Sequence, residues 1–237
     1  KNSMRQILQN KKGLVENVFD KVYDKYDLMN DFMSLGVHRL WKKDLLNIMA
    51  PSKNSKLIDV ACGTGDIGSL FLKKTNYSGY VLNVDSNINM IKQGKKRFQN
   101  LKNFNWKVSN AEKLEFKSNE FDYYTISFGL RNTKNINKSL SEAYRVLKPG
   151  GKYLCLEFSK IENQNLDLIY SYYSKIIPHI GKFVVGNREP YDYLVKSIKK
   201  FLNQDQLIDC MEKNGFVNCK YRNLSGGIVA IHSGWKI

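Results

Sequence analysis

The chain has 237 residues, of which 42% are hydrophobic and 25% are charged, so its composition excludes a disordered protein and suits one α/β domain with a sizeable core. No apolar run reaches the length of a membrane span, and Lys1 to Asn10 contains no long apolar core, so we expect neither a transmembrane helix nor a signal peptide. The net charge of +16 fits a lysine-rich solvated surface, and it equally fits binding to nucleic acid or to an anionic membrane face.

The cysteines and histidines show no metal-binding spacing. The four cysteines contain no CxxC pair and do not approach the three histidines at a spacing typical of zinc sites. We therefore expect no metal, and we interpret the cysteines as small buried side chains in a reducing, intracellular compartment. They are Cys62, Cys155, Cys210 and Cys219.

The N-terminal part is predicted to be helical. In residues 14–33, valine, aromatic and methionine side chains recur at steps of three and four, which indicates an amphipathic helix. Gly36-Val37 interrupts it, and a second helix is predicted from His38 to Met49, ended by Pro51. Because these helices precede the first strand, they can fold over the sheet as a lid, although ordinary core packing explains them equally well.

From Lys56 onward, strands and helices alternate regularly. This alternation predicts a mostly parallel sheet with right-handed crossovers, whose ligand site lies at the carboxyl ends of the strands. A turn is predicted at Lys148-Pro149-Gly150-Gly151. Strands are predicted over 56–61, 79–84, 104–108, 121–126 and 152–157, and helices over 66–74, 87–99 and 134–147.

A tyrosine-rich, apolar insertion occupies residues 163–201, and a helix over 204–213 and strands over 215–222 and 226–233 follow it. No flexible linker or repeat divides the chain, so we expect one domain over 1–237. Its parts are a helical lid (1–50), a cofactor-binding core (56–160), a helical substrate insertion (161–203) and the C-terminal strands (204–237).

A glycine-rich loop follows the first predicted strand. Gly63, Gly65 and Gly68 allow a sharp turn and a close approach of a ligand to the backbone, and the N–H groups of the next helix face that ligand. The spacing also fits a dinucleotide fingerprint, so an NAD-binding reductase remains an alternative. Asp59, inside the strand, favours S-adenosylmethionine, which carries an ammonium and a sulfonium instead of a pyrophosphate; a role as a turn cap is its alternative.

Three further strand ends carry candidate site residues. Asp85 can accept hydrogen bonds from both ribose hydroxyls, and the polar loop at Asn110 and Ala111 can contact an adenine edge. The segment SFGLRN, from Ser127 to Asn132, lacks the proline-rich motif typical of enzymes that methylate nucleic-acid bases. Arg131 can stabilise an oxyanion on a substrate, or it can form a structural salt bridge.

Several segments together resemble the ubiquinone/menaquinone biosynthesis C-methyltransferases of the UbiE type. The resemblance covers most of the chain from about Val18 onward. It rests on YDLMNDFMSLGVHRLWK (26–42), DVACGTGD (59–66), NAEKLEF (110–116), ISFGLRN (126–132), YRVLKPGG (144–151), LEFS (156–159), PYDYLVKSI (190–198) and the ending GGIVAIHSGWKI.

The resemblance implies a fold, a cofactor and a reaction. The fold would be a class I methyltransferase (Rossmann-like) sheet with its last strand antiparallel and helices on both faces. S-adenosylmethionine would contact the loop at Gly63, Thr64 and Gly65, and Cys62 stands where relatives often have glycine. Further cofactor contacts would be Asp85, Asn110, Ala111 and Ser127. The reaction would be ring C-methylation of a polyprenylated methoxybenzoquinol or demethylmenaquinol.

For catalysis we expect Arg131 to donate to the acceptor oxygen, Asn132 to orient it or a water, and Tyr26 to complete the site from the lid. His38 is the rival proton acceptor because its ordinary pKa lies near neutrality. Residues 15–33 and 166–185 are expected to form an apolar tunnel for the isoprenoid tail.

The expected partner is a lipophilic quinol, met by a cytoplasmic protein at the inner face of the membrane. Contact with the membrane surface or with other quinone-biosynthesis proteins is expected, nucleic acid is not, and homodimer formation stays open. A methyltransferase for another small molecule or RNA, and a non-catalytic binding module, remain as alternatives.

Overall fold

The computed structural model describes residues 36–161 and 189–237. The chain divides into two compact units, Lys1–His38 with Ile161–Lys200 and Arg39–Lys160 with Phe201–Ile237. Of the first unit the structure describes chiefly the amphipathic helix α8 (Glu189–Lys200). The expected lid at 1–50 and insertion at 161–203 lie largely outside the described residues, and the expected single domain stays a prediction.

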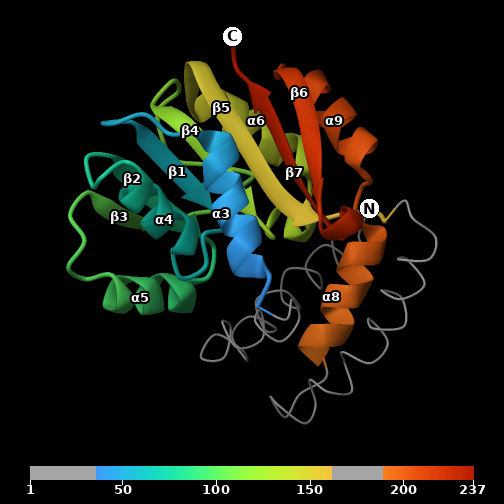
Figure 1. Ribbon diagram of the computed structural model, residues 1–237, viewed down its shortest axis with the longest axis horizontal. Helices are drawn as coiled ribbons and strands as arrows, with labels where there is room; N and C mark the ends of the chain where they lie inside the picture. The colour runs from blue at the N-terminus through green and yellow to red at the C-terminus, as the bar shows by residue number, and fades with distance from the viewer. Residues whose placement is uncertain (1–35, 162–188) are drawn as a thin grey trace, which may run out of the picture. The chain divides into compact units, whose positions relative to one another are not determined.

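The second unit is built on a seven-stranded sheet (Figure 1). Its strand order is β3-β2-β1-β4-β5-β7-β6, and every ladder is parallel except those of β7, which runs antiparallel to both of its neighbours. The strands are β1 (Lys56–Val60), β2 (Tyr80–Asp85), β3 (Phe104–Val108), β4 (Phe121–Ser127), β5 (Leu147–Phe158), β6 (Val217–Leu224) and β7 (Val229–Trp235).

The strand order reverses between β1 and β4, which pair directly although β2 and β3 separate them in the chain. Their register places Asp59 beside Thr125, while on its other side Asp59 lies beside Asn83 of β2. A reversal of this kind opens a crevice at the carboxyl ends of the two strands. The glycine loop and the segment SFGLRN begin at these two ends, so the fold brings both of them to one site.

Helices cover the sheet on both faces, and Figure 1 shows α3 in front of it and α6 behind it. Asparagine side chains cap α5, α6 and α9 at their N-termini, where each accepts hydrogen bonds from backbone N–H groups. The helices are α3 (His38–Met49), α4 (Asp66–Lys74), α5 (Ile88–Arg97), α6 (Ile136–Val146) and α9 (Gln204–Lys213).

The structure corrects three predicted boundaries. The predicted turn at 148–151 lies inside β5, where the pairs Phe121–Leu147 and Tyr123–Lys152 flank a bulge that accommodates the extra residues. The strands predicted over 215–222 and 226–233 run instead over β6 and β7. A short 3₁₀ turn at Ser225–Gly227 separates them, and Gly226 and Gly227 take left-handed φ values of 68° and 97° there.

Over residues 36–161 and 189–237, the structure contains no helix that combines the length and the apolar character needed to cross a bilayer.

Candidate active site

The glycine loop turns through left-handed backbone conformations that only glycine adopts easily. Gly63 has φ 55°, and Gly65 has φ 89° as the N-cap of α4. A Cβ placed on Gly65 would lie 2.5 Å from Cη2 of Trp106, which also closes on Gly94 of α5. The indole ring therefore supports the loop from the side of α5. The glycine spacing pointed to the loop, but no local signal singled out Trp106.

Asp85, at the end of β2, holds the loop in place. Its Oδ2 accepts a hydrogen bond from the Gly63 N–H at 2.8 Å, and its Oδ1 accepts one from the Asn87 N–H at 2.9 Å. Burial raises the pKa of this carboxyl group, while these backbone donors favour its ionised form. A carboxylate has about four acceptor sites, so Asp85 retains capacity for the ribose hydroxyls that the sequence predicts it to bind.

Asp59 is a buried carboxyl group with one unsatisfied oxygen. Its Oδ1 accepts from Thr125 Oγ1 at 2.7 Å, whereas its Oδ2 is buried and has no hydrogen-bond partner within the described ranges 36–161 and 189–237. Burial, with the charges of Asp85 and Asp66 adding to it, raises its pKa to about 7. A site beside the buried carboxyl groups of Asp59 and Asp85 favours a cation and opposes a pyrophosphate, because a further anion is costly at low dielectric.

Two cations hold Asp66, the first residue of α4. Lys42 Nζ lies 2.7 Å from Asp66 Oδ2, and Arg97 Nη1 lies 2.8 Å from Asp66 Oδ1. Arg97 also donates to Oγ1 of Thr64 at 3.2 Å, and Thr64 is buried. Helices α3 and α5 thus both attach to the loop. Sequence reasoning missed both cations, although Lys42 ends the first segment that carried the family resemblance.

The end of β4 packs closely against the end of β1. Ala61 and Phe128 both have left-handed backbones, with φ of 54° and 55°, and a Cβ on Gly129 would lie 2.3 Å from that of Ala61. Such strain persists where the surrounding structure enforces it, and it gathers at functional sites. Ser127, the residue before Phe128, has a buried Oγ with no hydrogen-bond partner in the described part of the chain.

Arg131 is paired with a buried acid. Its Nη1 donates to Glu157 Oε1 at 2.7 Å and to the Phe128 carbonyl, and its backbone N–H donates to Glu157 Oε2 at 3.3 Å. Its Nε is buried without a partner among the described residues. The salt-bridge alternative for Arg131 therefore has a structural basis, and the catalytic role stays a prediction. Asn132 donates from Nδ2 to the same Phe128 carbonyl at 3.5 Å.

The loop after β3 brings Asn110 and Ala111 to the same edge of the sheet. Asn110 Oδ1 accepts from the Glu112 N–H at 2.8 Å, and Asn110 pairs with Lys113 in an isolated bridge. Asn110 is exposed, and Ala111 packs partly against the core. Their contacts with adenine remain predictions.

The remaining candidates are placed less completely. Tyr26 and the tail-tunnel segments 15–33 and 166–185 lie outside the described residues. His38, the rival base, is buried. Burial and the acids Asp85 and Asp59 raise the pKa of the Cys62 thiol, which disfavours a reactive thiolate.

The described residues fit S-adenosylmethionine. Asp59 Oδ2 and Ser127 Oγ are buried polar atoms without a hydrogen-bond partner in the described part of the chain, and they lie on the neighbouring strands β1 and β4, next to the glycine loop. Buried polar atoms normally have partners, so a ligand with a positive charge and polar groups would satisfy them. Within the described ranges no three His, Cys, Asp or Glu side chains gather to hold a metal ion.

Comparison with known proteins agrees with this site. Residues 5–236 match the ubiE/COQ5 methyltransferase family. The chain belongs to this family. Two relatives named ubiquinone/menaquinone biosynthesis C-methyltransferase UbiE are 50% identical (Rickettsia bellii, strain OSU 85-389) and 49% identical (Rickettsia prowazekii, strain Madrid E) over 237 residues. Each alignment covers 96% of this chain and 94% of the relative. The family resemblance is therefore confirmed, and the protein is a methyltransferase.

Solved structures confirm the class I fold. A SAM-dependent methyltransferase from Thermotoga maritima aligns with a TM-score of 0.67 at 19% identity and covers 94% of this chain and 99% of that one. A phosphoethanolamine N-methyltransferase from Haemonchus contortus, in complex with S-adenosyl-L-methionine, aligns with a TM-score of 0.62 at 16% identity. That alignment covers 82% of this chain and 52% of that one. At these identities the likeness concerns the fold alone.

Proposed function

We propose that this protein transfers a methyl group from S-adenosylmethionine to a ring carbon of a polyprenylated quinol. The substrate is 2-methoxy-6-polyprenyl-1,4-benzoquinol, demethylmenaquinol or both. The names of its relatives support this reaction at 50% identity over nearly the whole chain. The structural observation that carries the cofactor part of the proposal is the buried Asp59 carboxyl group, with one oxygen unsatisfied, near the end of the strand that leads into the glycine loop.

Residues at three strand ends each bind a different part of the cofactor. Asp59 attracts the charged methionine end, Asp85 accepts from the ribose hydroxyls, and Asn110 and Ala111 contact the adenine. Thr64 and the glycine loop provide backbone contacts between these groups. When bound, S-adenosylmethionine supplies an electrophilic methyl group on a positively charged sulfur.

Arg131 serves the acceptor side. Glu157 and the Phe128 carbonyl fix its guanidinium through Nη1, so that its remaining N–H groups donate to the quinol oxygen and favour loss of the phenolic proton. Deprotonation makes the ring carbon nucleophilic, and Asn132 orients the oxygen or a water that takes the proton. Once it carries the methyl group, the ring carbon must lose its own hydrogen as a proton, which restores the aromatic ring and lets the oxygen be protonated again. Tyr26, which lies outside the described residues, stays our third proposed catalytic residue.

The Arg131 guanidinium lies against one aromatic ring of a small cluster, which makes its surroundings apolar. The Phe128 ring centroid lies 6.2 Å from that of Trp41 and 5.1 Å from that of Phe158, and the Arg131 Cζ lies 5.4 Å from the Phe158 ring. A transfer in which an anionic oxygen and a sulfonium neutralise each other is favoured in such a dry, oriented site.

The other candidate functions fit less well. A reductase would bring a pyrophosphate next to the buried carboxyl groups of Asp59 and Asp85, where a further anion is costly. A methyltransferase for another small molecule or RNA would use the same cofactor site, so only the acceptor distinguishes it.

We place the protein at the inner face of the cytoplasmic membrane, in peripheral contact. A lipophilic quinol resides in the bilayer, and the net charge of +16 favours an anionic surface. Contact with other proteins of quinone biosynthesis, and a homodimer, are compatible with this placement.

The decisive experiment supplies the purified protein with each quinol and methyl-labelled S-adenosylmethionine and locates the label by mass spectrometry and NMR. We expect label on a ring carbon. Label on oxygen, or no product with either quinol while the cofactor binds, would overturn the proposed substrate. NADH binding in place of S-adenosylmethionine, by calorimetry, would favour a reductase. Deleting the gene and identifying the quinone precursor that accumulates tests the same assignment in the cell.

A further inference from the structure

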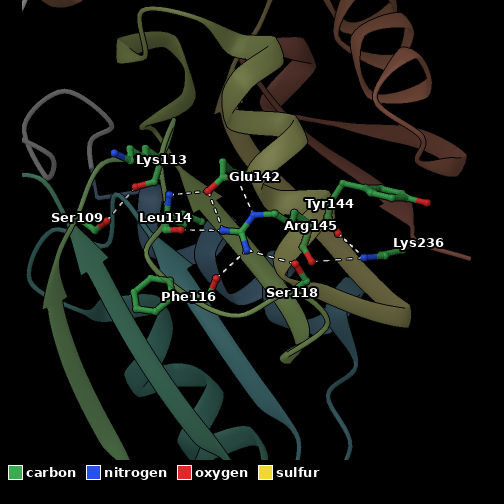
Figure 2. A network of polar contacts seen from close by, with 9 residues as sticks. All are labelled: Ser109, Lys113, Leu114, Phe116, Ser118, Glu142, Tyr144, Arg145 and Lys236. Carbon is green, nitrogen blue, oxygen red and sulfur yellow. Dashed lines mark hydrogen bonds and ion pairs between the residues drawn. The ribbon is translucent and has the colours of Figure 1, made fainter.

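Arg145, near the end of α6, binds the backbone of a distant segment (Figure 2). Its Nη2 donates to the Leu114 carbonyl at 2.7 Å, and its Nη1 donates to the Phe116 carbonyl at 2.7 Å and to Ser118 Oγ at 3.4 Å. The planar guanidinium thus spans three acceptors in the connection between β3 and β4. A lysine could not reproduce this fork, because its ammonium is a single point donor.

Glu142, one helical turn earlier, completes the arrangement. Its carboxylate accepts from Arg145 Nε at 2.7 Å and from Arg145 Nη2 at 2.9 Å, and its Oε2 also accepts from the Leu114 N–H at 2.6 Å. Leu114 is therefore held at both its N–H and its carbonyl, by two side chains that hold each other. The Leu114 side chain is also buried, so packing holds this residue in addition to the two backbone hydrogen bonds.

The held segment leads directly into the adenine loop. Lys113, the residue before Leu114, pairs with Asn110 in the isolated bridge, and its carbonyl accepts from Ser109 Oγ at 3.3 Å. Figure 2 shows Ser109 and Lys113 beside Leu114, with the Glu142–Arg145 pair on its other side. A displacement of Leu114 would therefore move Asn110 and Ala111.

The end of α6 is itself anchored. Lys236 Nζ donates to the Tyr144 carbonyl at 2.8 Å and to Asn119 Oδ1 at 2.7 Å. A cation that binds the last carbonyls of a helix stabilises its C-terminus. The helix that carries Glu142 and Arg145 is thus a firm base for the loop.

We propose that Glu142 and Arg145 are positioning residues for adenine recognition: they hold residues 114–118, and through them Asn110 and Ala111, at the edge of the adenine ring. This inference rests on the proposed cofactor site. The two residues touch neither the cofactor nor the substrate in this arrangement, and they act on selectivity among cofactors through the loop.

The test compares two ligands that differ only in the base. S-adenosylhomocysteine carries the adenine amino group, and S-inosylhomocysteine carries an oxygen in its place. The wild-type protein should prefer the first. Arg145→Lys should raise its Kd for S-adenosylhomocysteine roughly tenfold, the factor for losing about one hydrogen bond, and should change its Kd for S-inosylhomocysteine much less. The KM for S-adenosylmethionine should rise while kcat at saturating cofactor stays close to wild type.

Lys148→Met is the matched control. Lys148 and Asp122 form an ion pair of the same 2.7 Å length and similar exposure near the beginnings of β4 and β5, away from the carboxyl ends. Removing it should leave the affinities for both ligands unchanged. If Arg145→Lys does not fold, Glu142→Gln tests the proposal by the same ratio of the two Kd values. This variant weakens the ion pair with the arginine and keeps an acceptor for the Leu114 N–H.

Each outcome decides. A loss of selectivity in Arg145→Lys or Glu142→Gln, absent in Lys148→Met, supports the proposal. Equal weakening of both ligands, or wild-type affinity and selectivity in these variants, overturns it and leaves the proposed function intact. A wild-type protein that binds neither ligand overturns the proposed function together with this inference.

Discussion

The Arg131 guanidinium and the Glu157 carboxylate form an ion pair 2.7 Å long, with side chains only 6% and 1% exposed. The pair joins the loop after β4 to the end of β5. A buried pair of this kind contributes little net stability as a whole, but removing one partner leaves the other as an uncompensated buried charge. Arg131 therefore has a structural task in addition to its proposed catalytic one.

Arg131→Ala should lower kcat by about 10²-fold or more, as the loss of an oxyanion donor does, while cofactor affinity stays nearly normal. It should also lower the free energy of unfolding by about 3–5 kcal/mol, because Glu157 is left unpaired. Steady-state kinetics, calorimetry and denaturant titration measure the three quantities. His38→Ala should cost much less activity.

Glu157→Gln separates the structural role of Arg131 from its proposed catalytic role, because it keeps the arginine and leaves an uncharged acceptor for it. It should retain much more activity than Arg131→Ala if Arg131 donates to the substrate. Equal losses in the two variants would make Arg131 a purely structural residue. A dead His38→Ala variant that has lost the pH–rate limb near neutrality, beside an active Arg131→Ala, would transfer the proton-accepting role to the histidine.

Gly65→Ala should abolish cofactor binding. The backbone at Gly65 is left-handed, and the new Cβ would lie 2.5 Å from the Trp106 ring, so the loop must move. Gly150→Ala is the control, because Gly150 has φ 78° but nothing within 4 Å of its Cβ position. It carries only the backbone strain, of order 1–2 kcal/mol. Calorimetry with S-adenosylhomocysteine should show normal binding in the control; normal binding in Gly65→Ala would place the ligand elsewhere.

Asp85→Ala should weaken S-adenosylmethionine binding by roughly 1–3 kcal/mol, the cost of leaving polar groups unsatisfied. Part of this loss comes through the loop, because Asp85 also accepts from the Gly63 N–H. Thr64→Arg should block the loop sterically. Unchanged affinity of either variant in calorimetry would contradict the cofactor site.

Cofactor affinity should depend on pH through Asp59. Its pKa lies near 7 in the cofactor-free protein, against an ordinary value of 3.8, because burial disfavours the carboxylate. A cationic ligand favours the carboxylate, so binding below pH 7 releases a proton. Affinity should therefore fall by up to about tenfold per pH unit below 7 and level off above it. Asp59→Asn should flatten this profile; an equally steep profile in that variant would assign the dependence to another group.

Acid should destabilise the fold through His232. Its Nε2 donates to the Gln204 carbonyl at 3.1 Å, and burial lowers its pKa from 6.5 to about 4. Between these values the unfolded chain binds the proton and the native chain does not. The free energy of unfolding should therefore fall by about 3 kcal/mol as the pH drops from 6.5 to 4, with no further loss from this group below 4. In denaturant titrations, His232→Gln should not show this fall in the free energy of unfolding. An identical fall in the variant would assign the pH dependence to another group.

The sequence by itself predicted the elements and the cofactor loop. The helices at His38–Met49, Asp66–Lys74 and Gln204–Lys213 and the strand at Phe104–Val108 have the predicted bounds, because apolar periodicity, caps and proline act within a few residues. The glycine loop was equally visible, since glycine adopts left-handed backbone more easily than other residues do. The antiparallel last strand came from the family resemblance alone.

Only the tertiary structure decided which side chains meet. Trp106 closes on Gly65, Glu157 neutralises Arg131, and Arg145 holds the backbone of Leu114 and Phe116. The tertiary structure also places the predicted turn at Lys148–Gly151 in a bulge inside β5. Pairing with β4 on both sides of the glycines outweighs their local preference for a turn. Local patterns are set by neighbours in the chain, whereas these contacts depend on the strand order, which brings residues distant in sequence to one edge of the sheet.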